Sequence, residues 1–148
     1  MVLFPAEPLS VCKLPFYLVL VPAGFPSPAT EFVEGKLDLN EHLIHRPAAT
    51  FFVRVVGDSM IGEQIRSGDL AVVDRSLTPG KGDIVVAIVN GELTIKTLQW
   101  RGGRNEPRDL RLEAANPAYG PITIADGDDF QIWGVVTATI HQRRRPER

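Results

Sequence analysis

The chain has 148 residues, which is enough for one domain with a buried core. Its formal net charge of −2 provides no overall attraction to a nucleic-acid backbone, so we expect no direct DNA binding. A single cysteine, Cys12, excludes an intramolecular disulfide and fits a reducing compartment, so the predicted location is cytoplasmic.

The longest apolar run near the N-terminus, Leu14–Phe25, is too short to span a bilayer, and no membrane association is expected. Val21-Pro22-Ala23 fits the small-residue rule for signal-peptide cleavage, which is an alternative interpretation of this region. Against it, no Lys or Arg precedes Lys13, and prolines interrupt the apolar stretch.

Proline is concentrated at the start of the chain, where six of the 12 prolines lie within the first 28 residues. Because proline lacks a backbone N–H and fixes φ, this segment is unsuited to a sheet interior and is predicted to be an extended arm. Two short helical turns are predicted inside it, one beginning at Ser27-Pro28 and one over Asp38–Ile44.

From Thr50 onward the pattern changes to short β-rich runs separated by Gly, Pro, Asn and Asp. Strands are predicted over Phe51–Val56, Leu70–Asp74, Asp83–Val89, Leu93–Trp100, Leu110–Ala114 and Phe130–Ile140. Asn90-Gly91 is typical of a type I′ hairpin turn. The predicted fold is a mostly β, compact and partly barrel-like domain that carries an extended N-terminal arm.

One stretch, Phe51–Arg75, combines a strand, a sharp turn at Gly57–Met60, a short helical turn and a second strand. A hydroxyl at such a strand end is exposed and lies close to free backbone N–H groups, as a nucleophile requires. Ser59 is therefore the candidate nucleophile. A Ser-His-Asp triad would need His42, His45 or His141, which all lie in arm or tail segments.

Lys96 is the better candidate for a base that activates Ser59. Strand alternation places it on one face with Leu98 and Trp100. A lysine on an apolar face either extends its ammonium to solvent or is desolvated, which lowers its pKa and makes it a general base. The residues alone leave both explanations open.

No Cys/His cluster with zinc-ligand spacing and no Gly-rich phosphate loop occurs in the sequence, so neither a metal nor a cofactor is predicted.

A set of motifs in this chain resembles the self-cleaving Ser/Lys peptidase domain shared by LexA-type repressors and UmuD-type proteins. The motifs are GDSM at 57–60, SGDLAVVD at 67–74, GDIVVA at 82–87, GELTIKTL at 91–98 and NPAYGPI at 116–122. The UmuD-type proteins are the nearer match, through GFPSPA at 24–29 and FVEGKLDLNEHLI at 32–44. LexA-type repressors carry an N-terminal helix-turn-helix, whereas the segment before Gly24 is short and Pro-rich.

The resemblance implies roles for matched positions. Ser59 corresponds to the nucleophile and Lys96 to the neutral general base, with the backbone N–H groups of Asp58 and Ser59 as the oxyanion hole. Ala23-Gly24 corresponds to the scissile bond. The implied parts are a removable segment 1–23, an arm 24–49, a peptidase-like domain 50–141 and a basic tail 142–148, whose simplest interpretation is a solvated end.

The resemblance also implies partners. It indicates a homodimer, activation by a RecA filament on single-stranded DNA, and a shortened form that joins a UmuC-like Y-family polymerase for error-prone translesion synthesis in the SOS response. One alternative is a peptidase-fold binding module that no longer cleaves. A second is a signal-peptidase-like Ser/Lys enzyme, which the lack of a membrane anchor in this sequence disfavours.

Overall fold

The computed structural model describes residues 10–17, 21–26 and 34–144. The chain divides into two compact units, Met1–Pro47 and Ala48–Arg148. Among the described residues, no helix has the length and apolar character needed to cross a membrane.

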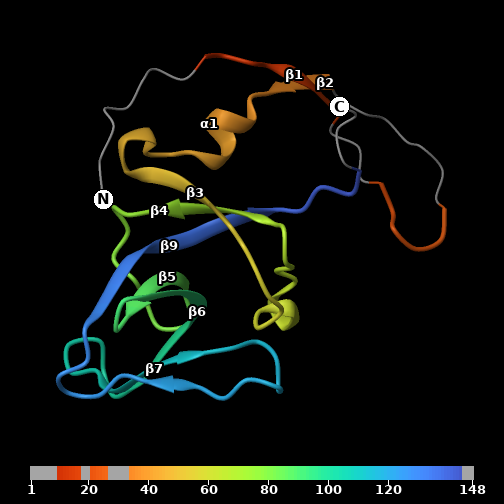
Figure 1. Cartoon of the computed structure of the whole chain (residues 1–148). Coiled ribbons are helices and arrows are strands. Elements are labelled where there is room, and N and C mark those ends of the chain that lie inside the picture. Colours follow the sequence, from red (N-terminus) through yellow and green to blue (C-terminus); the bar gives the residue numbers. More distant parts are fainter. Residues whose placement is uncertain (1–9, 18–20, 27–33, 145–148) are drawn as a thin grey trace. The chain divides into compact units, whose positions relative to one another are not determined.

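The N-terminal unit contains a two-stranded antiparallel sheet of β1 (Leu14–Tyr17) and β2 (Glu34–Leu37) (Figure 1). The sequence did not predict these strands, because β1 contains Pro15 and β2 contains Gly35. Both strands of a two-stranded sheet are edge strands, and an edge strand can tolerate a residue that lacks an N–H. The predicted Ala23-Gly24 bond lies in the connection between them.

A short helix follows β2. The helix α1 (Leu39–Leu43) confirms the helical turn predicted for this region. Its N-cap residue, Asp38, accepts a hydrogen bond from the Asn40 N–H at 2.9 Å and one from the Cys12 N–H at 3.1 Å. Asp38 therefore ties the segment before β1 to the start of α1. The helix expected at Ser27-Pro28 lies outside the described residues.

The second unit is a seven-stranded sheet with the order β3-β4-β9-β5-β6-β7-β8 (Figure 1). The strands are β3 (Thr50–Arg54), β4 (Leu70–Asp74), β5 (Ile84–Val89), β6 (Glu92–Arg101), β7 (Arg108–Glu113), β8 (Ile122–Thr123) and β9 (Phe130–Ile140). Two single-turn 3₁₀ helices, η1 (Pro47–Ala49) and η2 (Ile61–Glu63), flank β3. All six predicted strands are confirmed within about two residues at their ends, while β8 was not predicted.

The long strand β9 curls the sheet. Its first half pairs with β5 and its second half pairs with β4, and the register shifts in both ladders. At the crossover, Gly134 lies so close to β4 that a Cβ atom would meet Val73 Cγ1 at 2.7 Å and the Asp74 carbonyl oxygen at 2.9 Å. The mostly β, partly barrel-like prediction is confirmed, since the sheet forms a curled half-barrel.

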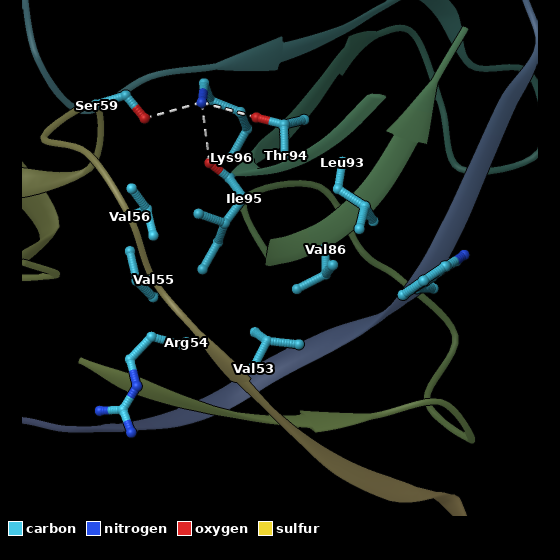
Figure 2. A pocket seen from close by; sticks show the side chains of 11 residues that line it. Val53, Arg54, Val55, Val56, Ser59, Val86, Leu93, Thr94, Ile95 and Lys96 are labelled. Carbon is cyan, nitrogen blue, oxygen red and sulfur yellow. Dashed lines mark hydrogen bonds between the residues drawn. The ribbon is translucent and has the colours of Figure 1, made fainter. Parts of the chain in front are cut away.

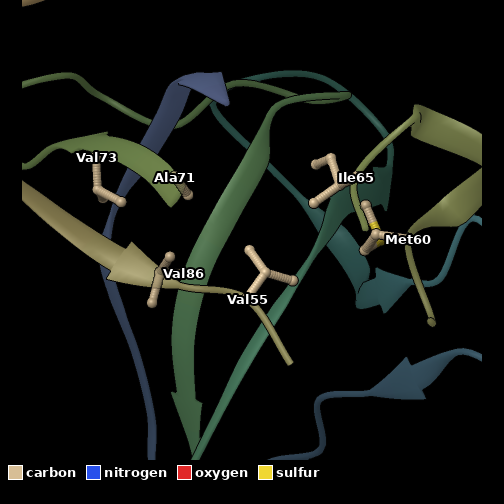
Figure 3. Packing of buried hydrophobic residues seen from close by; sticks show 6 residues of the cluster. All are labelled: Val55, Met60, Ile65, Ala71, Val73 and Val86. Atoms are coloured by element: carbon tan, nitrogen blue, oxygen red, sulfur yellow. The ribbon is translucent and has the colours of Figure 1, made fainter. Parts of the chain in front are cut away.

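Apolar side chains pack on both faces of β5. Val86 joins a cluster with Val55, Met60, Ile65, Ala71 and Val73, which Figure 3 shows converging from separate segments. Its neighbours Val85 and Ala87 point the other way into a cluster with Leu98, Trp100, Leu112 and Val135. Burial on both faces makes β5 a rigid support for its hairpin partner β6.

Gly134→Ala is expected to destabilise the domain, because the added methyl group overlaps Val73 and the Asp74 backbone. Overpacking of this kind costs about 1–3 kcal/mol. Urea unfolding followed by circular dichroism measures it, with Gly103→Ala as the control, since no atom lies within 4 Å of a Cβ there and its φ is not positive. Equal unfolding midpoints for both variants would contradict this account of the crossover.

Candidate active site

The turn that carries Ser59 begins where β3 leaves the sheet. Val55 still bonds to the opposite segment, donating its N–H to the Asp69 carbonyl at 2.9 Å and accepting the Gly68 N–H at 2.7 Å. The chain then turns at Gly57, whose φ of 93° favours glycine. The helical turn η2 begins at Ile61, so Ser59 lies between a strand and a helical turn, as predicted.

The buried side chain of Met60 anchors this turn in the core. Its side chain is 1% exposed and packs beside Ile65 and Val55 in the cluster of Figure 3. The Met60 carbonyl also accepts the Ile65 N–H at 3.2 Å. Because the residue that follows Ser59 is fixed in the core, the partly exposed Ser59 side chain is held at the surface of the domain.

Lys96 is positioned by the β5–β6 hairpin. Asn90 and Gly91 have φ values of 49° and 83°, as the predicted type I′ turn requires. The Asn90 side chain also binds a second loop, donating to Asp128 at 3.1 Å and accepting the Asp129 N–H at 3.0 Å. These contacts fix the register that aligns Lys96 with Val85.

Lys96 is buried, with 9% of its surface exposed. Its cross-strand neighbour Val85 is fully buried, and Leu98 and Trp100 follow on the same face of β6. Loss of water around the ammonium lowers the pKa of Lys96 below its ordinary value of 10.5. The structure thus decides between the two explanations of this lysine in favour of the desolvated one.

The Lys96 Nζ atom contacts three oxygens (Figure 2). They are Ser59 Oγ at 2.8 Å, Thr94 Oγ1 at 2.9 Å and the Ile95 carbonyl at 3.1 Å. A protonated amine can donate to all three. A neutral amine has two N–H donors and one lone pair, so it can donate to Thr94 and Ile95 and accept the Ser59 hydroxyl proton. The site therefore suits both protonation states.

No carboxylate forms an ion pair with Lys96 in the described part of the chain. Burial is thus the one cause of its lowered pKa, with no opposite charge nearby to counteract it. An uncompensated buried amine next to a hydroxyl has the arrangement of a base and its nucleophile.

Two backbone donors lie beside the hydroxyl. Within the described residues, neither the Asp58 N–H nor the Ser59 N–H donates to an acceptor. Both are the predicted oxyanion donors, and both belong to an exposed turn that an incoming carbonyl can reach.

A cleft of about 250 Å³ opens beside this pair. Its lining is mainly apolar and comes from the end of β3 and the turn after it, from β5, from the first half of β6 and from β9 (Figure 2). The lining residues are Val53, Arg54, Val55, Val56, Ser59, Val86, Leu93, Thr94, Ile95, Lys96 and Trp133. Such a concave, mainly apolar lining with a few polar groups is typical of a ligand-binding site.

The loop before β8 supports the Ser59 turn, and sequence reasoning assigned it no role. The Ala115 N–H donates to the Ser59 carbonyl at 2.8 Å, and the Asn116 side chain donates to the Asp58 carbonyl at 3.0 Å. Tyr119 donates its hydroxyl to the Asp58 carboxylate at 2.6 Å, which raises the pKa of Tyr119. The NPAYGPI motif at 116–122 was the available signal.

The histidine at the end of β9 has another partner. His141 Nδ1 lies 2.5 Å from the carboxylate of Asp69, which is buried in the turn before β4. Burial by itself raises the pKa of Asp69, but the Arg66 N–H and the His141 ring outweigh it, so the net pKa lies below its usual range. His141 thus contacts the turn before β4 through Asp69.

Ala23 and Gly24 lie in an exposed bend of the N-terminal unit. The described residues contain no group of three or more His, Cys, Asp or Glu side chains that could hold a metal ion.

Comparison with known proteins identifies the family of this chain. The family described as Peptidase S24-like matches residues 15–137. The chain belongs to the Peptidase S24-like family. This is a serine peptidase family whose members cleave themselves.

Several curated relatives are similar over most of their length. Protein SamA of Salmonella typhimurium is 49% identical, over 88% of this chain and 86% of that protein. Protein ImpA of Shigella flexneri is 45% identical, over 82% and 79% respectively. Protein MucA of Escherichia coli is 42% identical, over 88% and 86%. These are UmuD-type proteins, so the resemblance drawn from the motifs is confirmed.

Lys96 is expected to titrate below 10.5, because the folded protein disfavours its charged form. Selective ¹³Cε labelling of lysine and NMR titration would measure this, with Lys96→Met to assign the signal. Ser59→Ala should leave the low pKa in place, since burial is its cause. A Lys96 pKa at or above 10.5 would contradict the argument.

The same shift makes a stability prediction. Between the lowered pKa of Lys96 and 10.5, the unfolded chain binds more protons than the folded one, so the contribution of this group to stability rises with pH.

Proposed function

We propose that this protein is a self-processing serine peptidase that cleaves its own Ala23-Gly24 bond with a dyad of Ser59 and Lys96. The observation that carries the proposal is the 2.8 Å contact between Ser59 Oγ and the amine of a buried lysine. Membership of a family whose members cleave themselves supports it. Small residues on both sides of the bond leave little bulk around the attacked carbonyl.

In the proposed reaction, Lys96 acts first as a base and then as an acid, both when the ester on Ser59 forms and when it is hydrolysed. Neutral Lys96 takes the Ser59 hydroxyl proton as the alkoxide attacks the Ala23 carbonyl carbon. The Asp58 and Ser59 N–H groups stabilise the tetrahedral oxyanion. The lysine ammonium then gives its proton to the Gly24 nitrogen, and the peptide bond breaks to leave an ester of Ala23 on Ser59.

Hydrolysis of the ester repeats the sequence with water. Lys96 removes a proton from the attacking water molecule and returns it to Ser59 Oγ as the ester bond breaks. The products are residues 1–23 and 24–148, and no metal or cofactor takes part.

The biological role we infer rests on the UmuD-type relatives. In this role, a RecA filament on single-stranded DNA triggers cleavage in the cytoplasm during the SOS response. The shortened protein, as a homodimer, then acts as an accessory subunit of a UmuC-like Y-family translesion polymerase. Tethering of the substrate gives a high effective concentration, so a switch needs an arm that is held unproductive, or a protonated Lys96, before activation.

Cleavage is expected to accelerate with pH in the purified protein, because rising pH increases the neutral fraction of Lys96. Its midpoint should lie below 10.5. Incubation at several pH values followed by intact mass spectrometry measures the loss of residues 1–23. Ser59→Ala and Lys96→Ala should abolish the loss, whereas Lys81→Ala, which removes an exposed lysine of the same domain, should not.

A folded wild-type chain that stays intact at every pH would instead favour the binding module that no longer cleaves. Persistence of the cut in Ser59→Ala would identify an external protease, as the signal-peptide alternative requires.

The fragment 1–23 is expected to leave after cleavage. In the intact chain, residues 18–33 connect β1 to β2, and cutting this connection makes the pairing bimolecular. A two-stranded sheet is only marginally stable in water. Size-exclusion chromatography should therefore separate the two products at micromolar concentrations.

As a matched control, a disulfide between β1 and β2 should keep the fragment attached after cleavage. Phe16 faces Gly35 in the register, so Phe16→Cys with Gly35→Cys in a Cys12→Ser background should hold the fragment under oxidising conditions. Co-elution of the products without a disulfide would show that the strand pairing alone suffices.

A further inference from the structure

The segment between β7 and β8 holds the Ser59 turn by its backbone. Its Ala115 N–H donates to the Ser59 carbonyl, and the Gly62 N–H in η2 donates to the Ala115 carbonyl at 2.7 Å. These two bonds join the loop to both sides of the turn. The Asn116 side chain adds a third contact, from Nδ2 to the Asp58 carbonyl oxygen at 3.0 Å.

The Asn116 contact controls one peptide group. The bond between Asp58 and Ser59 is trans, since the described residues contain no cis peptide. In a planar trans peptide the C=O and N–H point in opposite directions. A side chain that holds the Asp58 carbonyl on one side therefore aims the Ser59 N–H toward the other side, where it donates to no acceptor in the described structure.

Asn116 is itself held in place. Its Oδ1 accepts the Ala118 N–H at 3.0 Å, and its carbonyl accepts the Tyr119 N–H at 3.0 Å. With Oδ1 engaged in the loop, the Nδ2 amide group is the donor left to face Asp58. The side chain is thus oriented before any substrate arrives, as electrostatic preorganisation requires.

Tyr119 contacts the side chain of Asp58, whereas Asn116 contacts its backbone carbonyl. Its hydroxyl donates to the Asp58 carboxylate at 2.6 Å, and this contact does not involve the peptide carbonyl. The raised pKa of Tyr119 keeps this donor protonated further into the alkaline range. Asn116 and Tyr119 therefore provide a matched pair of variants in one loop, one acting on the peptide group and one on the side chain.

We propose that Asn116 is a positioning residue for the oxyanion hole, which fixes the Asp58–Ser59 peptide so that the Ser59 N–H faces the attacked carbonyl. This inference rests on the proposed self-cleavage. It assigns to Asn116 a part in transition-state stabilisation that is separate from the activation of Ser59 by Lys96.

The test compares Asn116→Asp with Tyr119→Phe. Asn116→Asp keeps the shape and the acceptor for Ala118 but removes the donor to Asp58. We expect its maximal cleavage rate constant to fall about 10-fold or more, in line with the loss of oxyanion-hole donors. The rate constants are compared on the alkaline plateau, because the carboxylate introduced at position 116 favours the charged form of Lys96 and raises the pH midpoint. Tyr119→Phe should retain the rate within about 3-fold, since the peptide group keeps its partner.

Two further measurements separate positioning from folding and from failure of the peptidase proposal. Thermal unfolding identifies a loss of rate that comes from instability. Residual dipolar couplings report the direction of the Ser59 N–H vector without any cleavage, and they should change in Asn116→Asp but not in Tyr119→Phe.

Asn116→Asp with a wild-type rate and unchanged couplings would overturn the inference, as would a shift of the pH midpoint at constant maximal rate. A wild-type protein that never cleaves would refute the proposed peptidase function. The couplings would in that case still decide whether Asn116 orients the peptide.

Discussion

The arrangement of the site depends on one constraint, which is that a lysine amine is buried without a counter-charge. Lys96 lies opposite Val85 and beside Leu98, so its charged form is disfavoured. The contacts to Ser59, Thr94 and Ile95 are acceptable to either protonation state, whereas a nearby carboxylate would have favoured the ammonium. By removing water, the fold thus disfavours the charged form of this amine.

This constraint requires the two segments that carry Ser59 and Lys96 to be held close together. The amine must stay within hydrogen-bond distance of Ser59, which lies on a turn that leaves a different strand. The Asn90-Gly91 hairpin fixes the strand that carries Lys96, and Met60 fixes the turn from the core. Gly134 lets β9 cross close to β4 and curl the sheet. The hairpin, Met60 and Gly134 lie in separate parts of the chain, and each helps to hold Lys96 and Ser59 in place.

The N-terminal unit has a different construction. Its strands are short, β1 is exposed along its length, and the Asp38 side chain joins the segment before β1 to α1. Few buried contacts hold such a unit, so its strands can separate at low cost. That contrast agrees with the proposed function, in which the N-terminal unit is cut and the sheet domain carries the proposed dyad.

The sequence by itself determined six of the seven strands after residue 50, the type I′ turn, the Ser59 turn and the face of Lys96, because alternation and turn residues are local signals. Tertiary structure alone decided the burial of Lys96, since the pairing of β5 with β6 places Val85 beside it. It also decided the pairing of β1 with β2 and the contact of Asn116 with Asp58, a residue far away in the sequence. Contacts of this kind depend on how distant segments meet, and no local pattern of residues encodes that.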